Sequence, residues 1–117
     1  MPTNPLIIKM DQMLAKTENG QRGFVIAALY KFVAIDDIAT LRGQLQALCD
    51  DNAISGTILL ADEGINGTIA APRTGMLSFL CWLDSDQRFD GLSLKFSHSP
   101  DQPFLRMKVR PKREIVT

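Results

Sequence analysis

The chain has 117 residues, the length of a single domain, and its 45% hydrophobic and 22% charged residues match an ordinary globular protein. Its 13 basic and 13 acidic residues give a formal net charge of zero, so composition alone does not indicate a nucleic-acid partner. The first residues lack the pattern of a signal sequence, and no apolar run approaches the ~20 residues that cross a bilayer. We therefore expect a cytoplasmic protein without a membrane partner.

Residues 1–22 are expected to form an N-terminal extension, either a short helix or a disordered segment. Helical spacing is shared by five apolar residues: Leu6, Ile7, Met10, Met13 and Leu14. Polar residues and glycines then predict a loop over residues 17–23. We place the domain at residues 23–117 and no part of the fold before Gly23.

Residues 24–35 predict the first strand. Their near-continuous hydrophobicity, interrupted only by Lys31, indicates burial on both sides or at the sheet centre. Asp36 or Asp37 is expected to cap the following helix. This helix ends at residues 51–52, and its apolar face consists of Ile38, Leu41, Leu45 and Leu48.

Residues 56–62 and 68–71 predict two strands joined by a turn over residues 63–67. Asn66-Gly67 favours a type I′ hairpin turn, and Gly64 allows a bulge just before it. Pro72 ends the second strand, and Thr74 is expected to cap a second helix. The apolar side of that helix carries Met76, Leu77, Leu80 and Leu83, widened by Phe79 and Trp82.

Two more half-buried strands are predicted, one over residues 92–97 and one from Phe104 onward. In the last strand every second residue is a cation, so Arg106, Lys108 and Arg110 share one side. Lys112 and Arg113 continue this row, and Lys95 is expected to join it from the neighbouring strand. Such a surface would attract phosphates. A solvated edge strand that resists aggregation is the alternative left open.

The order β-α-β-β-α-β followed by one more strand predicts an α+β fold. The natural match is the ferredoxin-like or acylphosphatase-like sandwich, an antiparallel sheet with two helices on one face, here with an extra C-terminal strand.

No catalytic residue, metal site or cofactor site is predicted in this chain. His98 has no partner nucleophile, and Cys49 and Cys81 lack metal-site spacing, so we expect a surface histidine and two buried, reduced thiols. A free-standing acylphosphatase fails because acids, Asp36 and Asp37, stand where that enzyme needs a phosphate-binding loop with an arginine. Residues 68–71 carry no aromatic side chain for stacking bases, so any RNA contact should be to backbone and shape.

Three segments carry a family resemblance: residues 60–69 (LADEGINGTI), 94–97 (LKFS) and 103–117 (PFLRMKVRPKREIVT). Together they resemble the rhodanese-domain tRNA uridine hydroxylases. The hairpin signature of that family corresponds to Glu63, Gly64, Ile65, Asn66 and Gly67.

The resemblance implies the N-terminal, acylphosphatase-like part of an enzyme that converts the wobble uridine of certain tRNAs to 5-hydroxyuridine with molecular oxygen. It implies tRNA and the enzyme's own C-terminal rhodanese domain as partners. The reactive cysteine of the family belongs to the rhodanese loop, so neither Cys49 nor Cys81 receives a catalytic role. We expect an accessory domain that helps to position tRNA. The alternative is an interaction module that docks on the rhodanese domain or forms a dimer.

Overall fold

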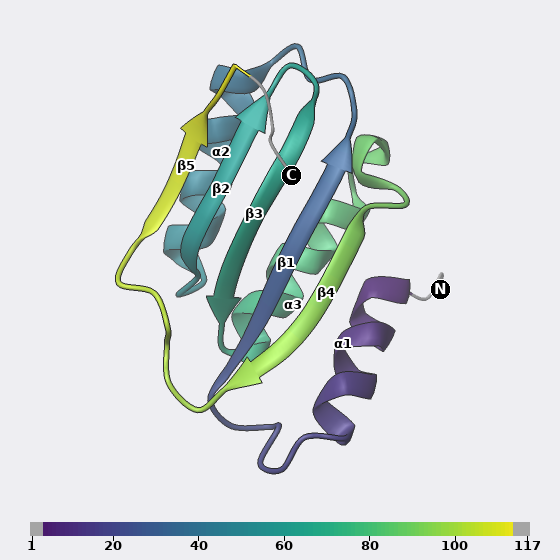
Figure 1. Cartoon of the computed structure of the whole chain (residues 1–117), viewed down its shortest axis with the longest axis vertical. Coiled ribbons are helices and arrows are strands. Elements are labelled where there is room, and N and C mark those ends of the chain that lie inside the picture. Colours follow the sequence, from purple (N-terminus) through teal and green to yellow (C-terminus); the bar gives the residue numbers. More distant parts are fainter. Residues whose placement is uncertain (1–3, 114–117) are drawn as a thin grey trace.

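The protein is described by a computed structural model over residues 4–113, in which helices cover one face of a five-stranded sheet (Figure 1). The elements, in chain order, are α1 (Pro5–Ala15), β1 (Phe24–Phe32), α2 (Ile38–Asp51), β2 (Ser55–Ala61), β3 (Gly64–Ala71), α3 (Arg73–Asp84), the 3-10 helix η1 (Gln87–Phe89), β4 (Ser93–Ser99) and β5 (Met107–Pro111). The predicted α+β sandwich is confirmed, with one helix added at the start.

The strand order is β4-β1-β3-β2-β5, and β5 runs parallel to β2 while the other pairs are antiparallel. The sheet is therefore mixed, not antiparallel throughout. After β4, residues 100–106 run along one end of the sheet to its far edge (Figure 1). The Gln102 side chain donates to the Ala70 carbonyl over 2.9 Å and anchors this connection.

One face of the sheet carries the core, and none of the helices described over residues 4–113 covers the other. Along β1, Val25, Ala27 and Leu29 are almost fully buried, while Ala28 and Phe32 between and beyond them are exposed. Of the two predicted alternatives, burial on both sides is wrong, because α2 and α3 both pack behind the sheet (Figure 1). The strand does lie inside the sheet, between β4 and β3. We call the opposite side the open face.

Helix α1 packs against the rest of the domain, so the prediction that no part of the fold lies before Gly23 is wrong. Met10 and Leu14 are 0% and 2% exposed and belong to the hydrophobic core. The Asp11 carboxylate lies 2.9 Å from the Arg73 guanidinium of α3, and the Lys9 ammonium donates to the Leu94 carbonyl of β4. The helix starts at a proline and is capped by Asn4, whose side chain accepts from the Leu6 amide over 2.9 Å.

The hairpin turn consists of Asp62 and Glu63, not of Asn66 and Gly67. Ala61 pairs with Gly64, and Asn66 and Gly67 lie inside β3 opposite Leu59 and Ile58. The Asp62 and Glu63 carbonyls each accept a 2.9 Å hydrogen bond from the segment after β1, at Ile35 and Val33. Those bonds hold the turn four residues earlier than its Asn-Gly signal suggests.

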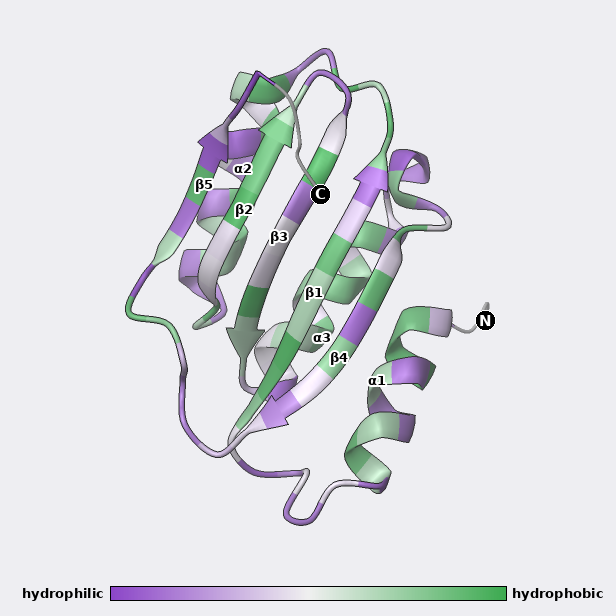
Figure 2. Ribbon diagram, viewed as in Figure 1, coloured by the Kyte–Doolittle hydropathy of each residue, from purple (hydrophilic) through white to green (hydrophobic). Residues whose placement is uncertain are grey.

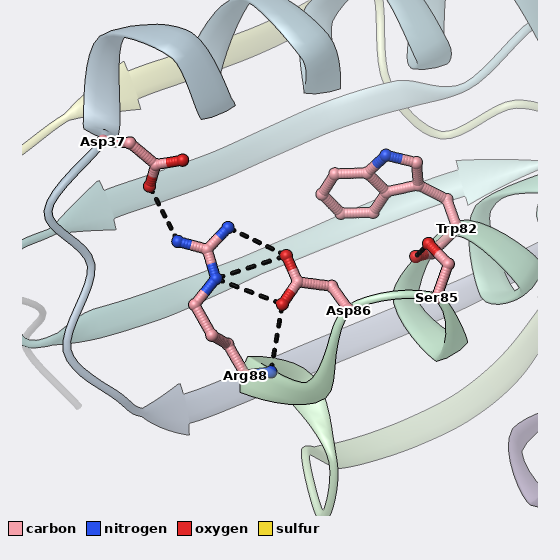
Figure 3. A network of polar contacts seen from close by, with 5 residues as sticks. All are labelled: Asp37, Trp82, Ser85, Asp86 and Arg88. Atoms are coloured by element: carbon pink, nitrogen blue, oxygen red, sulfur yellow. Dashed lines mark hydrogen bonds and ion pairs between the residues drawn. The ribbon is translucent and has the colours of Figure 1, made fainter.

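One predicted helix cap is wrong, and the other is correct in position but lacks the predicted hydrogen bond. Pro72, not Thr74, precedes the first residue of α3, so Thr74 lies within the helix. Asp37 does stand at the start of α2, but its side chain makes no capping hydrogen bond. Its carboxylate instead binds the Arg88 guanidinium at 2.7 Å, and Arg88 also binds Asp86 at 2.8 Å (Figure 3). The pair ties η1 to the beginning of α2.

Candidate nucleic-acid interface

The cations predicted to form a row lie on and around β5. We call Arg106, Lys108, Arg110, Lys112 and Arg113 the basic edge. Parallel pairing with β2 sets its register: Val109 is 2% exposed beside the fully buried Ile58, and the Arg42 side chain of α2 donates to the Val109 carbonyl over 2.8 Å. Since side chains alternate along a strand, Lys108 and Arg110 project from the open face.

Among residues 4–113 the five cations of the basic edge have no side-chain partner, as is also true of Lys16, Arg22 and Lys95, whereas the other five cations are engaged. Arg73 and Arg88 form salt bridges, Arg42 donates to a backbone carbonyl, and so do Lys9 and Lys31. Within residues 4–113 none of the five side chains of the basic edge takes part in a hydrogen bond or salt bridge. Four of them are exposed and Lys108 is half-buried. This leaves their charges available to a ligand.

A shallow hollow of about 400 Å³ lies at the start of β5 and is lined by Thr57, Arg106 and Lys108, together with the chain before the strand. Guanidinium, ammonium and hydroxyl groups are the donors that phosphate oxygens accept. The sequence predicts that the last strand begins at Phe104, but regular pairing begins only at Met107, and Leu105 is fully exposed beside this hollow.

Lys95 does not join the basic edge from a neighbouring strand. It lies on β4 at the opposite edge of the sheet, because β5 pairs with β2. The register places Lys95, Ala28, Thr68, Thr57 and Lys108 in one row across the open face. Four strand spacings of ~4.8 Å separate the two lysines by about 19 Å.

Some residues of the hairpin signature are required by packing, and others lie at the surface. Ile65 is fully buried, and a Cβ on Gly67 would meet the Thr57 carbonyl oxygen at 2.5 Å, which explains a glycine there. Glu63 lies in the turn, and Asn66 lies on the open face opposite Tyr30.

Sequence reasoning missed an aromatic pair on the open face. Tyr30 and Phe32 of β1 contact each other edge to face, with ring centroids 5.1 Å apart. The signal was present in the spacing, since residues 24, 26, 28, 30 and 32 share one side of a strand. Partial burial and the nearby charge of Glu63 both raise the pKa of Tyr30.

No group of three or more His, Cys, Asp or Glu side chains that could hold a metal occurs among residues 4–113. Cys49 is buried, and burial, with a smaller effect of Asp50, raises the pKa of its thiol to about 12. Cys81 is exposed, contrary to expectation, because it lies on the outer side of α3. His98 contacts the Arg22 carbonyl in the loop before β1. None of the helices described over this range is long and apolar enough to cross a bilayer.

Solved structures share this architecture. The BLUF protein BlrB in its dark state has a TM-score of 0.62 at 17% identity, covering 78% of this chain and 74% of that one. Full-length HypF in its phosphate- and nucleotide-bound form has a TM-score of 0.55 at 8% identity, over 74% of this chain and 12% of that one. These likenesses show the fold alone, an α+β sandwich with helices on one face of the sheet.

The family is defined more narrowly by the sequence. The family model described as the UPF0176 acylphosphatase like domain matches residues 24–115, and the chain belongs to this family. The tRNA uridine(34) hydroxylase of Sinorhizobium fredii is 50% identical over 107 residues, 92% of this chain and 34% of that protein. The one from Albidiferax ferrireducens is 51% identical over 94 residues, 80% of this chain and 30% of that protein. The chain thus spans about a third of these curated relatives.

Proposed function

We propose that the chain is the N-terminal domain of a tRNA uridine hydroxylase and that its basic edge helps to position the tRNA. The observation that carries this proposal is the gathering of five cations without a side-chain partner among residues 4–113 on and around one strand at the edge of the sheet. The names of relatives that are about half identical supply the substrate class.

Unpaired cations on one edge favour a polyanion as the ligand. Binding RNA phosphates releases counterions, so each neutralised phosphate contributes to affinity and to its decrease with salt. Such contacts carry no sequence information, which suits a domain that orients tRNA while another part of the enzyme reads and modifies the uridine.

The oxidation itself is assigned to the remaining two thirds of the enzyme. A rhodanese domain there would provide the reactive cysteine, and molecular oxygen would be the co-substrate. The thiol of Cys49, with its pKa near 12 and no exposed surface, is unsuited to that chemistry.

The test is charge reversal on the basic edge. In the 117-residue chain, Lys108→Glu/Arg110→Glu should weaken tRNA binding at least about tenfold at ~50 mM salt and make the dependence of affinity on salt shallower. Lys16→Glu/Arg22→Glu is the matched control, since it changes the same charge at exposed, unpartnered cations elsewhere. An equal loss in both variants, or no binding by the parent chain at low salt, would refute the proposal.

The uncovered open face supports a second function, docking on the rest of the enzyme. Under this alternative the isolated chain does not bind tRNA even at low salt but binds the separately produced catalytic part. A pull-down and a tRNA titration on the same preparation distinguish the two.

A further inference from the structure

Phe32 is the most exposed aromatic position that the fold holds in a defined arrangement. Its side chain is 60% exposed at the end of β1, on the open face. The ring meets that of Tyr30 at an interplanar angle of 83°, and Tyr30 is itself half-buried. An aromatic ring that is exposed to this extent and contacts a second ring on the same face is available for contact with a partner.

On the open face, Tyr30 lies in the same row across the sheet as Arg110 of the basic edge. Reading across the sheet, Tyr30 pairs with Asn66, Asn66 with Leu59, and Leu59 with Arg110. Three strand spacings put the backbones of Tyr30 and Arg110 about 14 Å apart. Lys95 stands on the same face one strand beyond β1. Cations thus lie on both edge strands of this face, Lys95 on β4 and Arg110 on β5. In Figure 2 much of β5 is coloured as hydrophilic.

The polarity of the open face favours a nucleic acid over a protein as the occupant. On this face Ser93, Lys95, Ser97, Thr57 and Thr68 are all exposed, while the apolar residues Ile26 and Leu59 are half-buried. The core of a stable protein interface is depleted of charged side chains, whereas single-stranded RNA binds where cations track its backbone and aromatic rings stack its bases.

We propose that Phe32, held in place by Tyr30, stacks on an unpaired nucleobase of an RNA strand whose phosphates lie on the basic edge. This inference rests on the proposed function and deepens it, because it adds a base contact to a phosphate contact. It also revises the expectation that this domain meets RNA only through backbone and shape. Stacking accepts any base, so it holds an unpaired loop without selecting its sequence.

The experiment compares two fluorescent probes of equal length, oligouridine and an abasic oligomer with the same phosphates but no bases. Phe32→Ala in the 117-residue chain should weaken binding of oligouridine by about 5- to 100-fold and leave binding of the abasic probe within about twofold. Phe32→Trp should retain the affinity of the parent for both. Ile8→Ala is the control, because it truncates an apolar side chain that is 42% exposed on α1, away from the open face.

The outcomes separate the two proposals. If Phe32→Ala binds oligouridine like the parent while Lys108→Glu/Arg110→Glu loses it, stacking is refuted and the phosphate contact stands. If Phe32→Ala weakens both probes equally, or if Ile8→Ala weakens oligouridine as much, stacking is also refuted. If the parent chain binds neither probe nor tRNA, both proposals fall together.

Discussion

The carboxylate of Asp37 lies 2.7 Å from the guanidinium of Arg88, so the first residue before α2 is bound to the 3-10 helix that precedes β4 (Figure 3). These two residues are 51 positions apart in sequence. The ion pair explains why Asp37 does not cap α2: its oxygens point to the cation and not to the free amides of the helix.

Replacing Asp37 by Asn should lower the free energy of unfolding by about 0.5–1 kcal/mol. Both side chains of the ion pair are partly exposed, so losing the charge should cost as much stability as losing a surface ion pair. The Asn side chain can recover part of this stability by capping α2. Urea denaturation measures the change. Asp36→Asn, at the exposed neighbour, is the control, and an equal effect of both substitutions would show that the ion pair contributes nothing.

The pH dependence of stability should include a contribution from Asp86. Hydrogen bonds from the Arg88 side chain hold the pKa of this carboxyl below its ordinary value. A lowered pKa means that the stabilisation is complete above the unfolded value of ~3.9 and is lost as the pH falls through the folded value. Asp86→Asn should therefore be less stable than the parent at neutral pH, and the difference should shrink below about pH 4. A difference that stays constant down to pH 2 contradicts this.

Gly67→Ala should be strongly destabilising, by at least about 1–3 kcal/mol, because the new Cβ would lie 2.5 Å from the Thr57 carbonyl oxygen and 2.9 Å from the Ile58 Cα. Gly43→Ala is the matched substitution in α2, where a Cβ meets nothing within 4 Å. It should stabilise by up to about 1 kcal/mol through helix propensity. Thermal unfolding of the two variants should shift in opposite directions, and shifts of the same sign would contradict the pairing of β2 with β3.

The two thiols should differ in reactivity. Iodoacetamide should modify Cys81 in the folded chain, because this side chain is exposed, whereas Cys49 should react only after unfolding. The raised pKa of Cys49 keeps its thiol protonated and unreactive. Mass spectrometry of native and denatured samples counts the adducts. Modification of Cys49 at the same rate as Cys81 under native conditions would show that the core opens readily.

Tyr30→Phe should leave the stability unchanged or raise it by up to about 1 kcal/mol. The Tyr30 hydroxyl is enclosed and has no hydrogen-bond partner among residues 4–113, so removing it relieves the cost of burying an unpaired polar group. Calorimetry of the parent and variant gives the comparison. A clear loss of stability would indicate that the hydroxyl has a partner in solution.

Local patterns in the sequence determined most of the secondary structure. The spacing of apolar residues in Ile38–Asp51 and Arg73–Asp84 predicted both helices that cover the sheet, because a helix must bury one stripe. Alternation predicted the one-sided basic row of β5 for the same kind of reason: side chains on a strand alternate between its faces.

Only the tertiary structure decided which elements meet. Strand β5 pairs with β2, so the basic edge and Lys95 of β4 lie at opposite edges of the sheet. This pairing depends on the long connection between β4 and β5, whose path no local pattern encodes. The packing of Met10 against the core and the position of the hairpin turn were decided in the same way. The turn does not form at Asn-Gly because backbone hydrogen bonds from Ile35 and Val33 hold it at Asp62 and Glu63, and because β2 approaches Gly67 closely. These contacts exist only once distant segments are packed together.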